Sequence, residues 1–228
     1  IYMAIKKIIA IGSAKGGVGK SSMTASIAIS LSKNNKVGIL DADIYGPNQH
    51  LLFNTNTKPK FEDTSIIPIS KQGIQIISIG NILNSEEAAI WRGPMLSGAI
   101  KKLIHSTKWD DLDYLLIDMP PGTGDAYLTI FNELNVDHFI LVTTENRLAI
   151  SDLKKTTTML NKLNINILGY IRNNILNMQD KFDDTFFKSN DITHLGTFLF
   201  DKKIYNFDCE YNSDVSNEIS KIIYIKTK

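Results

Sequence analysis

The most chemically informative feature of the chain is a glycine-rich string, GSAKGGVGKSS, at residues 12–22. It lies between a short apolar run and a stretch with helical spacing, which is the setting of loops that bind phosphate. Its glycines can adopt backbone angles that other residues avoid, so main-chain N–H groups can approach phosphate oxygens. The alternative, a glycine-rich turn that only joins a strand to a helix, is disfavoured by the Gly-Lys-Ser ending.

Three side chains at the end of this string complement the main-chain amides. Lys20 supplies a mobile positive charge for the outer phosphates, and the Ser21 hydroxyl is a ligand for Mg²⁺. Ser22 follows and is within reach of the α-phosphate. The sequence therefore predicts that ATP binds here with Mg²⁺. The predicted contacts within the loop are Gly16, Gly17, Val18, Gly19, Lys20, Ser21 and Ser22.

Three aspartates follow apolar runs and are expected to work with this loop. Asp41 and Asp43 are two residues apart in LDAD, so on an extended backbone both side chains point the same way. The alternative for this pair is a turn or helix-capping role. Asp118 ends the run YLLID, where an ionised carboxylate needs a cation to offset the cost of burial. Because Mg²⁺ is such a cation, Asp118 is predicted to act on the metal.

The elements that must position these groups alternate along the chain. Short apolar runs predict strands, and the longer stretches between them have helical spacing. The expected strands are 6–12, 36–41, 75–80, 114–119, 138–144 and 166–174, and the expected helices are 20–33, 86–106, 125–134 and 147–163. Strands that are apolar throughout indicate a mostly parallel sheet covered on both faces. The predicted fold is a three-layer α/β sandwich of the P-loop NTPase kind, with ligands at the carboxyl ends of the strands.

Two segments lie outside this regular alternation. Residues 54–73 are rich in Asn, Thr and Lys and are expected to form a loop or an excursion at the sheet edge. Residues 215–228 have apolar residues at helical spacing. We expect this last helix to pack on the sheet rather than bind a membrane.

Composition limits the classes of function. The 25 Lys and Arg residues nearly balance the 24 Asp and Glu residues, so no basic field indicates nucleic-acid binding. The length of 228 residues favours one domain over residues 1–228. No apolar run approaches the roughly 18–20 residues of a membrane helix, and the start of the chain has no signal-peptide pattern. The single cysteine, Cys209, fits a reducing compartment, so we predict a cytoplasmic protein that does not bind membranes.

Lys15 adds a resemblance to a known group of proteins. The run from Lys15 to Ser21, KGGVGKS, resembles the deviant Walker A motif of the ParA/MinD, nitrogenase-iron-protein and ArsA group. Three further strings are DADIYGPN (41–48), WRGPM (91–95) and DMPPGTGD (118–125). Together these strings look like the Mrp/ApbC branch, the P-loop ATPases that carry iron–sulfur clusters. The resemblance covers about residues 6–173.

The resemblance implies a dimeric ATPase. It implies a homodimer with nucleotide at the interface, in which Lys15 reaches the partner's nucleotide. It implies that Lys15, Lys20 and Asp43 are the catalytic residues. Asp43 would position the attacking water. Asp41 would support magnesium through its water shell, and Asp118 would be the Walker B residue.

The resemblance also implies two roles that the residues leave open. Asn173 stands where the group has an adenine-contacting Asn, although Asn174 is an alternative. Arg92 is either a charge contact near the dimer face or a structural salt bridge. Trp91 is expected to pack in the core or an interface.

The chain departs from the Mrp/ApbC pattern where the cluster would bind. Members usually carry CxxC after this Asn, and a bridging [4Fe–4S] cluster takes four thiolates, two from each subunit. Here no cysteine lies between Asn173 and Cys209, so no iron–sulfur ligand set is identifiable. Glu145 and Leu199 also stand where the group often has Pro, which makes the base-recognition surface less defined.

Two functional hypotheses follow from these observations. The first is an Mg²⁺-dependent ATPase switch in iron–sulfur cluster assembly or transfer, with assembly or apo-target proteins as partners. The second is a MinD/ParA-like positioning or adaptor ATPase that carries no cluster. A third possibility is a degenerate relative that dimerises with a cysteine-bearing paralogue.

Overall fold

The computed structural model describes residues 5–55, 57–82, 93–174, 182–206 and 213–228. Trp91, Arg92 and Cys209 lie outside these residues, as does most of the segment in which the Mrp/ApbC group carries its CxxC. The roles expected for these three residues therefore stay predictions.

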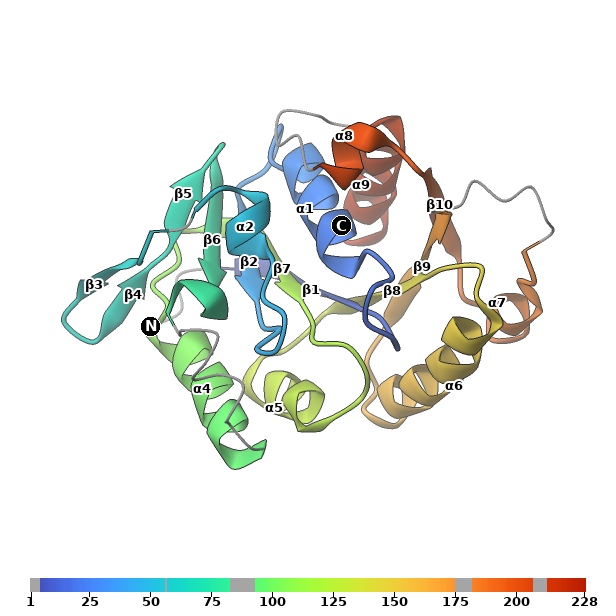
Figure 1. Cartoon of the computed structure of the whole chain (residues 1–228), viewed down its shortest axis with the longest axis horizontal. Helices are drawn as coiled ribbons and strands as arrows, with labels where there is room; N and C mark the ends of the chain where they lie inside the picture. Colours follow the sequence, from blue (N-terminus) through green and yellow to red (C-terminus); the bar gives the residue numbers. More distant parts are fainter. Residues whose placement is uncertain (1–4, 56, 83–92, 175–181, 207–212) are drawn as a thin grey trace.

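An eight-stranded sheet forms the centre of the described structure (Figure 1). Its order is β10-β9-β8-β1-β7-β2-β6-β5, and every neighbouring pair is parallel except β5 with β6 at the edge. The strands are β1 (Ile5–Gly12), β2 (Val37–Asp41), β5 (Ile69–Lys71), β6 (Ile74–Ser78), β7 (Leu112–Asp118), β8 (His138–Thr143), β9 (Ile167–Asn174) and β10 (His194–Leu199). The chain leaves β1 toward β2 on one side and later adds β8 on the other, so the sheet order reverses at β1. Ligands of such folds bind at this reversal, beyond the carboxyl ends of the strands.

Helices cover both faces of the sheet. One face carries α1 (Lys20–Leu31), α2 (Gln49–Leu52), α8 (Lys202–Tyr205) and α9 (Asp214–Lys226), and the other carries α4 (Gly93–Ser106), α5 (Asp125–Glu133), α6 (Arg147–Lys162) and α7 (Thr185–Ser189). A separate hydrophobic core lies under each layer of helices. This arrangement confirms the predicted three-layer α/β sandwich with a mostly parallel sheet.

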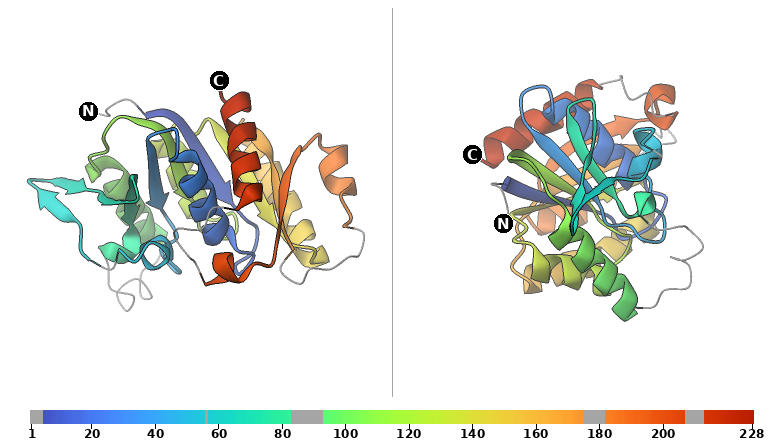
Figure 2. Two further views of the ribbon diagram at one scale, coloured as in Figure 1. Left: turned by 90° about the horizontal axis from the view of Figure 1, so that it is seen from above. Right: turned by 90° about the vertical axis from the view of Figure 1, so that its left-hand side faces the viewer.

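The segment at 54–73 is an edge excursion. It holds a small antiparallel hairpin, β3 (Lys60–Glu62) with β4 (Ser65–Ile67), and the edge strand β5. Figure 2 shows this hairpin projecting from the end of the molecule opposite β10. A turn of 3-10 helix, η1 (Ile79–Asn81), follows β6.

The last helix packs against the protein, as expected. Ile219 and Ile223 of α9 are fully buried, and Ser30 Oγ of α1 donates a hydrogen bond of 2.9 Å to Asn217 Oδ1. Among the described residues, no helix has both the length and the apolar character that crossing a bilayer requires.

Candidate functional site

A cavity of about 320 Å³ opens at the carboxyl ends of the central strands. It is lined by Ser13, Lys15, Gly16, Gly17, Gly19, Lys20, Ser21, Ser22, Asp43, Asn48, Leu52 and Pro121. The structure thus brings most of the predicted loop contacts to one cavity together with Asp43. Four predicted site residues do not line it: Val18, Asp41, Asp118 and Asn173.

The backbone of the loop explains its glycines. Gly17 and Gly19 have φ angles of 79° and 84°, in the left-handed region that side-chained residues avoid. A Cβ on Gly19 would also collide with the amide nitrogen of Asn173. No atom of the described residues lies within 4 Å of the position that a Cβ would take on Gly16 or Gly17, so this part of the loop is open toward them. The loop leads directly into α1, whose first N–H groups add to an anion-binding nest.

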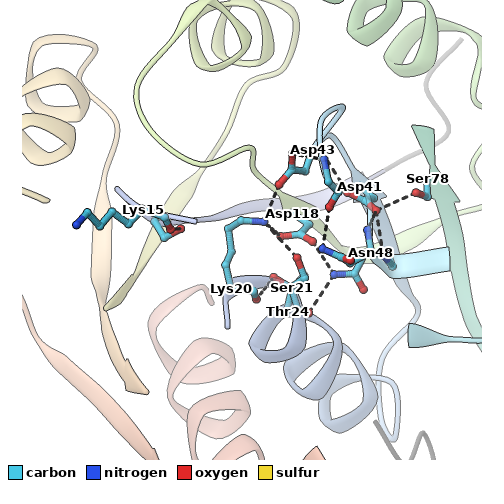
Figure 3. A network of polar contacts seen from close by, with 12 residues as sticks. Lys15, Lys20, Ser21, Thr24, Asp41, Asp43, Asn48, Ser78 and Asp118 are labelled. Carbon is cyan, nitrogen blue, oxygen red and sulfur yellow. Dashed lines mark hydrogen bonds and ion pairs between the residues drawn. The ribbon is translucent and has the colours of Figure 1, made fainter. Parts of the chain in front are cut away.

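Lys20 is buried among oxygen atoms (Figure 3). Its Nζ forms an ion pair with Asp118 Oδ1, lies 3.3 Å from Ser21 Oγ and lies 3.9 Å from Asp43 Oδ2. A hydroxyl and two carboxylates therefore surround one cation. Such hard oxygen donors, combined with phosphate oxygens and waters, are the ligands that Mg²⁺ prefers. The donor set thus fits Mg²⁺ held next to a bound triphosphate.

Asp118 is fully buried at the end of β7. While its Oδ1 pairs with Lys20, its Oδ2 accepts a hydrogen bond of 2.7 Å from Gln49 Nε2. The same Gln49 nitrogen donates a bond of 3.0 Å to the Ser21 carbonyl oxygen. A buried carboxylate is stable only with such partners, and both of its oxygens have one here.

Asp41 is also fully buried, but it serves the chain rather than the cavity. Its Oδ2 accepts hydrogen bonds from Asn48 N and Gln49 N, both 3.0 Å, and from Ser78 Oγ at 2.8 Å. Its Oδ1 accepts a bond of 3.2 Å from Asp43 N. β2 ends at Asp41, so Asp43 lies beyond the strand. That both side chains point the same way stays a prediction. Asp41 thus organises the loop of residues 42–49. Its support of magnesium through the water shell stays a prediction.

Burial raises the pKa of both aspartates, but the neighbouring charge with the largest effect on the pKa differs between them. Burial raises the pKa of Asp41 to about 7, and the nearby charge of Asp118 adds to this rise. Burial also raises the pKa of Asp43, while the Lys20 ammonium opposes the shift. Asp43 lines the cavity, and its Oδ1 accepts a bond of 3.2 Å from Gly46 N. Its carboxylate is therefore held at the wall of the cavity.

Lys15 is oriented differently from Lys20. Its side chain is partly exposed, and in Figure 3 it extends away from the cluster around Lys20. Ser13 Oγ donates a bond of 2.8 Å to the Lys15 carbonyl oxygen, which fixes the backbone at this point. The Lys15 side chain is thus directed away from the cluster around Lys20.

Asn173 contacts the loop from the end of β9. Its Nδ2 donates a bond of 2.9 Å to the Val18 carbonyl oxygen, while the Val18 side chain is buried in the core. Asn174 is buried as well. The adenine contact predicted for Asn173 stays a prediction, and the structure gives this residue a role in holding the loop.

The comparison with family models agrees with this geometry. The model that matches is described as "ParA: NUBPL iron-transfer P-loop NTPase", over residues 4–196. The chain belongs to this family. The predicted resemblance to iron–sulfur carrier P-loop ATPases is thereby confirmed.

Relatives of this NUBPL-type NTPase include iron–sulfur cluster carrier proteins. That of Rickettsia felis is 50% identical over 170 residues, which are 74% of this chain and 54% of that protein. That of Aquifex aeolicus is 46% identical over 175 residues, which are 74% of this chain and 48% of that protein. The chain spans about half the length of these curated relatives.

Solved structures with the same fold include nucleotide complexes. A nucleotide-binding protein from Archaeoglobus fulgidus in complex with ADP has a TM-score of 0.73 and 29% identity, covering 96% of this chain and 89% of that one. The cell division ATPase MinD of Pyrococcus furiosus has a TM-score of 0.74 at 20% identity, covering 97% of this chain and all of that one. The MinD likeness bears on the fold alone.

One departure of this NUBPL-type chain from its group has a visible structural consequence. Glu145 stands where the group usually has Pro. Its Oε1 lies 2.5 Å from Arg172 Nε, and the two form an ion pair. The Arg172 guanidinium also lies over the Phe182 ring, 4.8 Å from its centroid. Both partners of the ion pair are largely buried, so it ties β9 to the end of β8. Leu199 at the end of β10 is 58% exposed.

Sequence reasoning missed Gln49 and Ser78 in this site. Both are fully buried polar residues that contact Asp118 or Asp41. Gln49 directly follows the GPN string, and Ser78 ends an apolar strand. Ser78 could have been predicted in the same way as Asp118, because each is a polar residue at the carboxyl end of an apolar strand.

Proposed function

We propose that this chain binds ATP with Mg²⁺ and works as a nucleotide-dependent switch in iron–sulfur cluster assembly or transfer. The observation that carries the proposal is the buried Lys20, held by Asp118 and Asp43 beside an open glycine loop. Membership of the NUBPL iron-transfer family supports it. Relatives named iron–sulfur cluster carrier proteins and an ADP-bound relative structure support it further.

Nucleotide binding would exchange the partners of Lys20. The phosphates offer more negative charge than one carboxylate, so the ammonium would move from Asp118 to the outer phosphates. The loop amides from Gly16 to Ser22 would hold the phosphate oxygens. Ser21 Oγ and Asp118 would then face Mg²⁺, directly or through its waters. Magnesium supplies positive charge at the phosphates when it is bound.

Hydrolysis would follow as in-line attack of water on the γ-phosphate. Asp43 lines the cavity and would orient that water through its free lone pairs. Lys20, the loop amides and Lys15 from a partner would stabilise the charge that develops in the transition state. Because Lys15 would arrive only in a dimer, turnover would be slow and would depend on dimer closure.

A homodimer with nucleotide at its interface is part of the proposal. Lys15 extends away from its own Lys20, as a lysine acting on a partner's nucleotide must. Tyr45 and Leu148, which follow the carboxyl ends of β2 and β8, are 67% and 62% exposed. A dimer formed through this end of the sheet would cover such exposed apolar side chains.

The chain also has features that favour an adaptor without a cluster. Its only cysteine is Cys209, so two copies provide two thiolates where a [4Fe–4S] cluster takes four. The alternative is therefore a MinD/ParA-like positioning or adaptor ATPase. In the proposed role in cluster assembly or transfer, the cluster is cargo. Assembly proteins, target proteins or a cysteine-bearing paralogue would then supply the missing thiolates.

We also propose that residues 1–228 form one domain, because one sheet runs from β5 to β10 through the described residues. A cytoplasmic location stays a prediction.

Two measurements test the function. Isothermal calorimetry of the pure protein with ADP and Mg²⁺ should give a heat of binding, and its absence would refute the nucleotide switch. Anaerobic reconstitution with iron and sulfide, beside a CxxC-containing family member, should give visible absorption if this chain carries a cluster. Nucleotide binding without such absorption would favour the adaptor.

A further inference from the structure

Gln49 is a fully buried amide to which the predicted nucleotide chemistry assigns no role. It is the first residue of the four-residue helix α2, and none of its surface is exposed. Its Nε2 donates to Asp118 Oδ2 at 2.7 Å and to the Ser21 carbonyl oxygen at 3.0 Å. Both partners only accept hydrogen bonds, so the amide nitrogen, not the oxygen, must face them. Burying an amide is costly unless it is bonded, so the position needs this side chain's donors.

These two bonds join the two elements that carry the proposed magnesium site. Asp118 ends β7, and Ser21 belongs to the first turn of α1. Gln49 therefore fixes the distance between the carboxylate and the backbone that carries the Ser21 hydroxyl. Its own backbone is held in turn, since Gln49 N donates to Asp41 Oδ2 at 3.0 Å.

The bond from Gln49 also fixes the orientation of the Asp118 carboxylate. In the structure, Lys20 holds one oxygen of Asp118 and Gln49 holds the other. When phosphates draw Lys20 away, Asp118 Oδ1 is released. Of the two side-chain bonds that the described residues make to Asp118, only the bond from Gln49 then remains.

A second observation concerns the other polar atom of the same amide. Gln49 Oε1 is buried without a hydrogen-bond partner among the described residues. Buried polar atoms are almost always satisfied, often by ordered water. Water bound to Mg²⁺ is a strong donor, and the proposal below assigns such a water to this acceptor.

We propose that Gln49 is a positioning residue for Mg²⁺. It holds Asp118 and the start of α1 in the geometry that receives the hydrated ion after Lys20 has moved to the phosphates. The inference rests on the proposed function, because it requires Mg²⁺ and nucleotide in this cavity. It is independent of hydrolysis and of any cluster.

The test compares Gln49→Met with wild type by calorimetry with ADP, once in EDTA and once in saturating Mg²⁺. Methionine has a similar length and volume but lacks the amide. We expect affinity in EDTA to be unchanged, while the gain in affinity that Mg²⁺ provides falls about 10-fold or more, as for other residues that orient metal ligands. Gln75→Met is the matched control, since Gln75 bonds Asp110 through its Nε2 and does not line the cavity. It should keep the full gain.

The outcomes separate the inference from the function on which it rests. An unchanged Mg²⁺ gain in Gln49→Met, or an equal loss in EDTA and in Mg²⁺, would overturn the positioning role. Failure of the wild type to bind ADP in either condition would instead refute the proposed function.

A measurement on the wild type covers the case in which Gln49→Met does not fold. The side-chain amide signal of Gln49, followed by NMR, should stay protected from exchange when ADP binds in EDTA. It should then shift when Mg²⁺ is added. Loss of protection with ADP, or no response to Mg²⁺, would contradict the inference.

Discussion

Lys20 and Asp118 form an ion pair in which both side chains are buried, beside the cavity proposed for nucleotide. The pair links the start of α1 to the end of β7, next to the strand-order reversal at β1. A buried lysine needs a counter-charge, and a buried aspartate needs a cation. Each residue thus satisfies the other until a charged ligand competes. The pair keeps Lys20 and Asp118 each beside an opposite charge before nucleotide binds.

Removal of Lys20 should affect both binding and stability. Lys20→Ala leaves Asp118 and Asp43 without their cation, and breaking a buried pair from one side typically costs about 3–5 kcal/mol. We expect a lower free energy of unfolding by urea and loss of ADP binding by calorimetry. Lys33→Ala is the control, since Lys33 is an exposed lysine just beyond the same helix. Binding of ADP with wild-type affinity by Lys20→Ala would contradict the assigned site.

The proposed action of Lys15 across a dimer can be tested by mixing two inactive variants. Lys15→Ala should bind ADP normally but lose hydrolysis and ATP-dependent dimerisation, and Asp43→Asn should lose hydrolysis. In a mixed dimer, one site would combine an intact Asp43 with an intact Lys15 from the partner. If subunits pair at random, half of the dimers are mixed and each has one intact site, so an equal mixture should recover up to about a quarter of wild-type activity.

The control for this mixture is each variant alone at the same total concentration, measured by phosphate release. No recovery in the mixture would count against a lysine acting in trans. Full hydrolysis by Lys15→Ala alone would rule it out.

The role of Asn173 can be read from base selectivity. Asn173→Ala removes the donor to the Val18 carbonyl oxygen and relaxes the loop at Gly19. We expect the affinities for ATP and GTP to fall together, because loop order serves both nucleotides. Competition against a fluorescent ADP analogue measures the two affinities. A selective loss for ATP would instead support the adenine contact predicted from the sequence, with Asn174→Ala as the comparison.

Much of the fold was predictable because local composition decides it. All five residues of β2 are buried, and so are five of the six in β8, so their apolar runs predicted strands without reference to neighbours. β10 was missed because it is an edge strand whose exposure changes irregularly along HLGTFL. The glycine loop was predictable because its left-handed backbone angles favour glycine, so the residue types alone indicate them.

The missing parts of the site depend on contacts between distant segments. Gln49 follows a turn-like string, and its burial arises only where residues 42–49 meet both β7 and α1. The separate roles of Asp41 and Asp43 depend on where β2 ends. Spacing along an extended strand could not predict this, because the second residue lies beyond the strand.

The pH dependence of stability should include a contribution from Asp113 at the start of β7. Asp113 Oδ1 pairs with Lys6 Nζ at 2.7 Å, and Asp113 Oδ2 accepts a bond of 2.8 Å from Lys36 N. These partners, with the Lys6 hydrogen bond first, lower the pKa of Asp113 below its ordinary value of 3.8. The folded state therefore binds this proton less readily than the unfolded state, so the contribution is present above about pH 4 and is lost as the pH falls through the folded pKa. Asp113→Asn should lower the melting temperature near neutral pH. It should also make the melting temperature depend less on pH in the acid range. The control is Asp63→Asn, at an exposed turn residue, which should have neither effect. If Asp113→Asn and wild type lost stability in parallel from pH 6 to pH 3, these hydrogen bonds would make no net contribution to the fold.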